Sequence, residues 1–219
     1  MSTTDLRAFV RANLPGPPAR VLEVGAGDGG LARALRAAGY EVVAIDPEPK
    51  SDDVRAVALA DLDEPAGSFA AAVAVVSLHH VDPLEESCRR LGEVVEGGGT
   101  LVLDEFDVGS FDLEAAAWWL EQRKAIGEPQ PQTAEELVSD HRAHLHPLER
   151  ILAALEPQFE LGPPLRGAWL HRWKLGEAFR GVEEEAIARG DLRATGARLV
   201  GRRRASLHRA HPGLIPGTL

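Results

Sequence analysis

The sequence predicts an α/β fold built on a doubly wound, mainly parallel sheet. Its first hundred residues alternate strand-like and helix-like segments, which is the pattern of parallel strands joined by crossover connections. A glycine-rich turn, GAGDGG at 25–30, follows the first strand-like segment and opens a helix. With 219 residues, of which 44% are hydrophobic, the chain is long enough to bury a full core in one domain.

Apolar periodicity and breakers define the elements of the first half. The segment 5–13 reads as a short amphipathic helix that ends at the breaker LPGPP. Only the eight residues 47–54 separate the second and third strands, and a parallel crossover normally needs a dozen or more. A full crossover helix therefore does not fit there. The predicted strands are 20–24, 41–45, 55–59, 70–76 and 100–104, and the predicted helices are 31–38 and 83–95.

The pattern changes after Glu105 to a block of helices followed by two strand candidates. Thr133 with Glu136 fits a capping box, and Pro147 suits the first turn of a helix. Trp169, His171 and Trp173 alternate as they would on one face of a strand. The sequence thus predicts helices at 112–126, 134–143, 147–155 and 177–188, and a C-terminal antiparallel pair formed by strands 168–175 and 197–203.

Charge and composition exclude several functional classes. There are 34 acidic and 24 basic residues, and a net charge of −10 disfavours bulk nucleic-acid binding. No apolar stretch approaches the ~20 residues of a spanning helix, and the start lacks the apolar core of a signal peptide. We expect a cytoplasmic protein with no nucleic-acid or membrane partner.

No metal site is expected either. The single cysteine, Cys88, rules out an internal disulfide and a cysteine-rich zinc site. His141, His144 and His146 lie close together in the sequence, but no carboxylate or cysteine completes an evident ligand set.

The glycine-rich turn predicts a cradle for a nucleotide or nucleoside. Glycines remove the Cβ atoms that would keep a ligand away, and the following helix offers unpaired N–H groups. Gly25, Gly27 and Gly30 also satisfy the G-x-G-x-x-G dinucleotide fingerprint, with Asp46 about 20 residues further on. An NAD(P)-dependent oxidoreductase is therefore one alternative, although Glu23 opposes it because a carboxylate would repel a pyrophosphate.

Residues 18–106 resemble the class I S-adenosylmethionine-dependent methyltransferases, which have a three-layer Rossmann-like fold. The segment VLEVGAGDGG at 21–30 is similar to their first motif, and in the family an acid at the position of Glu23 serves the cationic amino-acid end of the cofactor. Asp46 matches the acid that accepts both ribose hydroxyls. Asp61 and Leu62 match the positions that contact the adenine, whereas Ala70 departs from the family's usual aspartate.

The segment Ser77–Leu78–His79–His80–Val81 resembles the L-H-H-V of small-molecule methyltransferases, and no (Asp/Asn)-Pro-Pro-(Tyr/Phe) segment of base methyltransferases occurs. The two histidines either pack under the loop or serve the substrate. The resemblance implies S-adenosyl-L-methionine as cofactor. The residues implied for its binding are Glu23, Gly25, Ala26, Gly27, Gly29, Asp46, Pro47, Asp61, Leu62, Ser77 and Leu78.

The expected function is methyl transfer to a small molecule by in-line displacement. We expect one domain over 1–219, with a cofactor-binding half at 1–106 and a substrate-side half at 107–219, as a monomer or homodimer. A non-catalytic cofactor-binding protein is the other alternative, because no catalytic residue stands out. The candidates for a catalytic base are His80, His144, His146 and Glu105.

Overall fold

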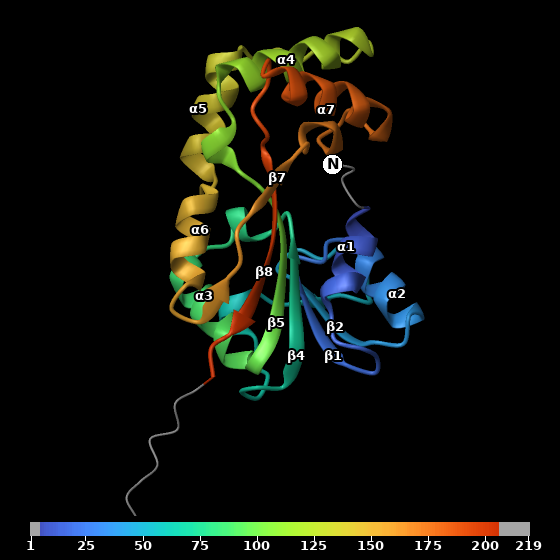
Figure 1. Cartoon of the computed structure of the whole chain (residues 1–219), viewed down its shortest axis with the longest axis vertical. Helices are drawn as coiled ribbons and strands as arrows, with labels where there is room; N and C mark the ends of the chain where they lie inside the picture. Colours follow the sequence, from blue (N-terminus) through green and yellow to red (C-terminus); the bar gives the residue numbers. More distant parts are fainter. Residues whose placement is uncertain (1–4, 206–219) are drawn as a thin grey trace, which may run out of the picture.

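The computed structural model describes residues 5–205 and is built around an eight-stranded sheet (Figure 1). The strand order is β3-β2-β1-β4-β5-β8-β6, and β7 also pairs with β8. The first five strands run parallel, and β8 is antiparallel to β5, β6 and β7. This confirms the predicted α/β class. The strands are β1 Arg20–Val24, β2 Glu41–Asp46, β3 Arg55–Ala56, β4 Phe69–Val75, β5 Val95–Phe106, β6 Phe159–Leu161, β7 Leu165–Gly167 and β8 Gly196–Arg203.

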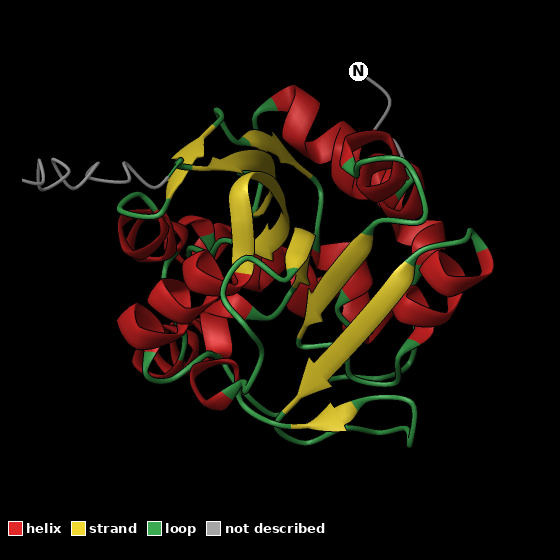
Figure 2. Cartoon of the chain, turned by 90° about the horizontal axis from the view of Figure 1, so that it is seen from below, coloured by secondary structure: helices red, strands yellow, loops and turns green. Residues whose placement is uncertain are grey.

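Helices cover both faces of the sheet, which forms a twisted layer between them (Figures 1 and 2). On one side lie α1 (Leu6–Asn13) and α2 (Gly30–Ala37), whose apolar residues share a core with the strands. On the other side lie α3 (Leu84–Val94) and α6 (Leu148–Leu155), in the largest buried cluster. The central strands are therefore buried on both faces, as parallel strands usually are.

A helical layer lies beyond one end of the sheet. It consists of α4 (Leu113–Ala125), α5 (Ala134–His144) and α7 (Arg180–Arg189) (Figure 1). Aromatic rings hold it together, since Trp119 stacks on Trp173 with ring centroids 3.9 Å apart and Phe106 stacks on Trp169 at 4.4 Å. The capping box of Thr133 and Glu136 begins α5 as predicted, whereas Pro147 is the cap before α6 rather than its first residue.

The predicted strand at 168–175 is wrong. Leu170–Arg172 forms a 3₁₀ turn, η4, and the C-terminal strands that pair antiparallel with β8 are instead β6 and β7. The backbone N–H groups of Trp169, Leu170 and His171 all donate to the buried carboxylate of Glu183, so they are not available to a sheet. The alternation of aromatic residues at this position reflects a turn wrapped around a carboxylate.

Two other elements differ from the prediction. The third strand has two residues instead of five, because the chain turns after Ala56 towards the 3₁₀ helix η1 (Leu59–Asp61). The helix predicted at 177–188 begins as a 3₁₀ turn, η5 (Glu177–Phe179), before α7. The short connection between β2 and β3 contains no helix, as its length predicts.

Within residues 5–205, none of the helices combines the length and the apolar character needed to cross a membrane.

Candidate functional site

The glycine-rich turn after β1 is held against the end of β2. The N–H groups of Gly25 and Ala26 both donate to the carbonyl of Ile45, at 2.9 and 3.0 Å. Gly25 has φ +69°, and a Cβ placed on it would lie 2.3 Å from the Cβ of Ser77. Position 25 therefore requires glycine both for its backbone conformation and for its close approach to the neighbouring strand exit.

Gly27 differs from Gly25 in its surroundings. It has φ +54°, and a Cβ there would meet nothing within 4 Å. Its N–H donates to Oδ2 of Asp46 at 2.9 Å, and Oδ1 of the same carboxylate accepts from the N–H of Glu48 at 2.9 Å. Asp46 thus joins the glycine turn to the loop after β2.

A cavity of about 570 Å³ opens at the carboxyl ends of β1, β2 and β4. Ligands of open α/β sheets bind at this edge, and the volume suits a cofactor-sized molecule. Acidic side chains outnumber the single lysine in its lining. The lining residues are Val24, Gly25, Gly27, Ile45, Asp46, Pro47, Glu48, Lys50, Val57, Ala58, Leu59, Val76, Ser77, His80, Val81, Asp82 and Ser87.

The structure thus brings together Gly25, Gly27, Asp46, Pro47 and Ser77 of the predicted cofactor residues. Three others are not part of its lining. Ala26 is buried in the turn, Gly29 caps α2 with φ +74°, and Leu78 is fully buried in the core.

The adenine contacts predicted from the sequence do not line the cavity. Asp61 is exposed, and Leu62 is buried in the core, because η1 turns its apolar side inward. The positions that reach the cavity after β3 are Val57, Ala58 and Leu59. β3 ends earlier than expected, so the chain reaches the cavity three residues before Asp61, at Ala58, which has no carboxylate. A contact of Asp61 and Leu62 with the adenine stays a prediction.

The exit of β4 contains a strained residue and an unpaired hydroxyl. Val76 has φ +52°, a conformation that β-branched residues rarely adopt. The Oγ of Ser77 is buried and has no hydrogen-bond partner among the described residues. Both residues line the cavity, and strain of this kind tends to concentrate at ligand sites.

Glu105 holds the exit of β4 in place by hydrogen bonds. Its Oε1 accepts from the N–H groups of Ser77 and Leu78 at 3.0 and 2.7 Å, and its Oε2 lies 2.6 Å from Nδ1 of His79. The side chain is fully buried. The carboxylate therefore acts as a hydrogen-bond acceptor that holds the backbone of the β4 exit. Because it is buried, it cannot reach a substrate as a general base.

The turn η4 repeats this arrangement with different residues. Glu183 accepts from three successive N–H groups, and its Oε2 also lies 2.8 Å from Nδ1 of His171. In both places, at the 3₁₀ turn η2 (Leu78–His80) and at η4, a buried glutamate and a histidine hold the turn. The sequence signal that could have revealed the pairing is the similarity of SLHH at 77–80 and WLHR at 169–172.

Only one of the three histidine candidates lines the cavity. His80 does, and burial together with His79, His141 and His146 lowers its pKa to about 4. Its imidazole is therefore neutral near pH 7 and able to accept a proton.

The other two histidine candidates, His144 and His146, are not part of the cavity lining and contact other groups of the protein. The Nε2 of His146 lies 3.0 Å from the carbonyl of Val81, and its backbone N–H donates to the carbonyl of His79, so it braces the β4 exit. His144 is exposed on α5, where it pairs with Asp140. Among residues 5–205, no group of three or more His, Cys, Asp or Glu side chains could hold a metal ion.

Glu23 lies beneath the glycine turn rather than in the cavity lining. It is 4% exposed, the N–H of Ala32 in α2 donates to it, and its Oε2 has no partner among the described residues. Burial raises its pKa to about 7, and the nearby Arg36 offsets part of this effect.

The raised pKa makes the stability of the folded protein depend on pH. Between pH 4.5 and 7 the folded state binds a proton that the unfolded state releases. The stabilising contribution of protonated Glu23 is therefore complete below pH 4.5 and is lost as the pH rises to 7. The loss amounts to about 3 kcal/mol above pH 7. Glu23→Gln should therefore stabilise the protein at pH 8, by about 1–3 kcal/mol in urea titrations, and far less at pH 4.5.

The control for this prediction is Glu41→Gln, which changes an exposed glutamate at the start of β2. It should alter the free energy of unfolding little at either pH. A gain for Glu23→Gln that is equal at both pH values would contradict the prediction.

A family model described as a methyltransferase domain matches residues 3–143. An uncharacterized methyltransferase of Staphylococcus carnosus is 29% identical over an alignment of 166 positions, which covers 69% of this chain and 76% of that protein.

Solved structures share the fold. An S-adenosylmethionine-dependent methyltransferase from Methanosarcina mazei is similar with a TM-score of 0.62 and 18% identity, covering 92% of this chain and all of that one. One from Mesorhizobium loti has a TM-score of 0.59 and 20% identity, covering 89% and 95% of the two chains. The [4+2]-cyclase SpnF has a TM-score of 0.59 and 19% identity, covering 92% and 81%. At these identities the likeness concerns the fold, which different activities can share.

Proposed function

Because this chain belongs to the methyltransferase domain family, as a class I S-adenosylmethionine-dependent member, we propose that it transfers a methyl group from S-adenosyl-L-methionine to a small molecule. The observation that carries the proposal is the placement of Asp46. Its carboxylate lines the cavity directly beside the open side of Gly27. A carboxylate presents two acceptor oxygens, which suit two vicinal ribose hydroxyls.

The donor set of the cavity fits the rest of this cofactor. Asp46, Glu48 and Asp82 give the lining an acidic character that favours a ligand with cationic groups. The unpaired hydroxyl of Ser77 and the bare backbone at Gly27 leave polar groups and space for a nucleoside. The apolar residues Val57, Leu59 and Val81 offer contacts for a planar base.

When bound, S-adenosyl-L-methionine would supply an electrophilic methyl carbon, which a nucleophile of the acceptor attacks in line while the C–S bond breaks and the thioether leaves as S-adenosylhomocysteine. This chain's residues position the reactants, and positioning can supply a large part of the barrier reduction. The rigid exit of β4, held by Glu105, places His80 at the cavity. Its neutral imidazole can take a proton from the acceptor, although its low pKa makes it a weak base.

A small-molecule acceptor suits the chain better than a nucleic acid. The net charge of −10 disfavours a phosphate backbone, and the segment typical of base methyltransferases is missing from the sequence. The helical layer of α4, α5 and α7 lies over the same end of the sheet and offers a cover for a small ligand (Figure 1).

Calorimetric titration with S-adenosylhomocysteine tests the proposal. We expect saturable binding to the unmodified protein and a loss of at least about tenfold in affinity for Asp46→Ala, which removes a charged bidentate acceptor. Asp52→Asn is the matched control, since it removes an exposed carboxylate from the same loop outside the cavity lining. Thermal unfolding of both variants shows whether the loss comes from binding or from folding.

Two further measurements separate the alternatives. Binding of NADH without S-adenosylhomocysteine would overturn the proposal and support an oxidoreductase. If S-adenosylhomocysteine binds, incubation with labelled S-adenosylmethionine and a panel of small acceptors distinguishes an enzyme from a non-catalytic binding protein. Failure to release S-adenosylhomocysteine with any acceptor class would argue against methyl transfer.

A further inference from the structure

A second cavity, of about 520 Å³, lies between α1, β7, β8 and η4. It shares no lining residue with the cavity at the glycine turn. Its charged lining is strongly one-sided, because four arginines face it together with a single carboxylate. These residues are Arg166, Arg172, Arg180, Arg198 and Asp104.

Asp104 is shared between two of these arginines. It is 2% exposed, its Oδ1 accepts from Nη1 of Arg172, and its Oδ2 accepts from Nε of Arg198 at 2.5 Å. Both carboxylate oxygens are thereby used. One carboxylate thus orients two guanidinium groups at the cavity.

Arg172 is the arginine best placed to bind a ligand. Within residues 5–205, its bond to Asp104 is the only hydrogen bond of its side chain, and 23% of that side chain is exposed. A guanidinium carries five N–H donors in a planar fork. Arg172 therefore presents N–H donors without a partner among residues 5–205 at the cavity, and its hydrogen bond to Asp104 holds the guanidinium in place.

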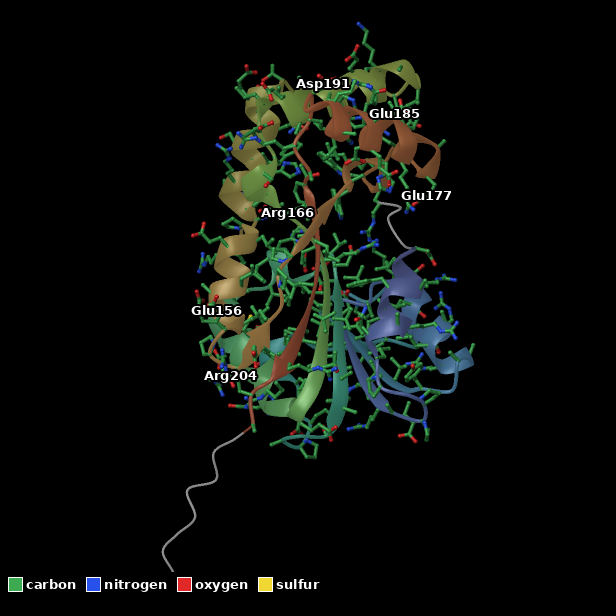
Figure 3. The ribbon with its side chains drawn as sticks, viewed as in Figure 1. Glu156, Arg166, Glu177, Glu185, Asp191 and Arg204 are labelled. Atoms are coloured by element: carbon green, nitrogen blue, oxygen red, sulfur yellow. The ribbon has the colours of Figure 1, made fainter. Side chains whose placement is uncertain are left out.

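Two further guanidinium groups come from neighbouring elements. Arg180 is paired with Glu177 at 3.0 Å, but 69% of the Glu177 side chain is exposed, so solvent screens this pair. Arg166, on β7, is bonded to the buried Asp107 (Figure 3, where Arg166 and Glu177 are labelled). Neither Glu177 nor Asp107 lines the cavity.

The rest of the lining includes apolar side chains. Phe9 of α1 and Trp169 contribute aromatic surface, and Leu165 is 65% exposed, which is unusual for a large apolar residue. A pocket with an apolar wall and a few convergent polar groups is typical of small-molecule sites.

We propose that this cavity is a second ligand site, which binds a small organic anion whose carboxylate or phosphate pairs with Arg172 and Arg180 and whose apolar body packs on Phe9, Leu165 and Trp169. The bidentate geometry of guanidinium groups suits both kinds of anion. The site does not depend on methyl transfer, because its residues are separate from the cofactor cavity.

Titration with benzoate, phenyl phosphate and the neutral benzamide tests this inference. We expect one of the two anions to bind saturably and to change the tryptophan fluorescence, since Trp169 lines the cavity. Benzamide should bind at least about tenfold more weakly, because it lacks the charge. The stronger anion identifies whether a carboxylate or a phosphate is preferred.

Arg172→Gln should weaken binding of that anion by at least about tenfold. Asp104 keeps Arg198 as a partner in this variant. Arg180→Gln provides a second test, which removes the screened pair with Glu177 and a long contact of 3.5 Å with Nε2 of His171. The matched control is Arg189→Gln, which removes an exposed arginine paired with Asp191 outside the cavity. Titrations without any cofactor keep the result independent of the proposed function.

Three outcomes would overturn the inference. They are no saturable binding of either anion to the unmodified protein, equal binding of benzamide, and equal weakening by Arg189→Gln and Arg172→Gln.

Discussion

Glu105→Ala is expected to lower the free energy of unfolding by about 3–5 kcal/mol, the cost of breaking a buried charged network. The substitution leaves the N–H groups of Ser77 and Leu78 and the Nδ1 of His79 without their acceptor in a site closed to water. Urea titration measures the change. Glu105→Gln should lower the free energy of unfolding less, because the amide oxygen of glutamine still accepts hydrogen bonds from the backbone.

The matched control is Glu96→Ala, which removes an exposed glutamate from the same strand, β5. Its effect should stay within about 0.5 kcal/mol, as for most surface changes. If Glu105→Ala and Glu96→Ala were equally mild, the carboxylate would not be the support of the β4 exit.

Gly25→Ala is expected to destabilise the protein by about 3 kcal/mol or more, from overpacking and an unfavourable backbone conformation together. The new methyl group would lie 2.3 Å from the Cβ of Ser77, so the glycine turn or the β4 exit must move. Thermal and urea unfolding report the loss of stability, and S-adenosylhomocysteine binding should fall as the cavity is displaced.

Gly27→Ala separates the two causes. Gly27 has a positive φ similar to that of Gly25, but a Cβ at position 27 would meet nothing within 4 Å. Gly27→Ala should therefore lower the free energy of unfolding only through the unfavourable backbone conformation, by about 1–2 kcal/mol. Similar losses for both variants would show that the contact with Ser77 is relieved by a small shift.

Local patterns were sufficient for much of the fold and for the centre of the site. The strand at 20–24, the glycine turn and the acid that ends β2 each occupy a few adjacent residues, so sequence spacing alone placed Gly25, Gly27 and Asp46 at one sheet edge. The capping box at Thr133 is equally local, and the length of 47–54 was enough to exclude a helix.

Predictions failed where distant residues decide the local conformation. The segment 168–175 alternates like a strand, but Glu183 takes its N–H groups and turns it into η4. The third strand was expected to reach residue 59, but β3 ends after Ala56 and the chain continues into η1, where Asp61 is exposed. Glu105 is a candidate base by its position in the sequence, but in the structure its buried carboxylate accepts from the N–H groups of Ser77 and Leu78 and contacts His79.

Short-range periodicity and the types of adjacent residues were enough to predict the α/β class, the family and the glycine turn with Asp46. They were not enough to predict which carboxylates line a cavity and which hold turns, or that Asp104 of β5 lies between Arg172 and Arg198. Burial and hydrogen-bond partners are set by packing between segments far apart in the chain, which no local pattern records.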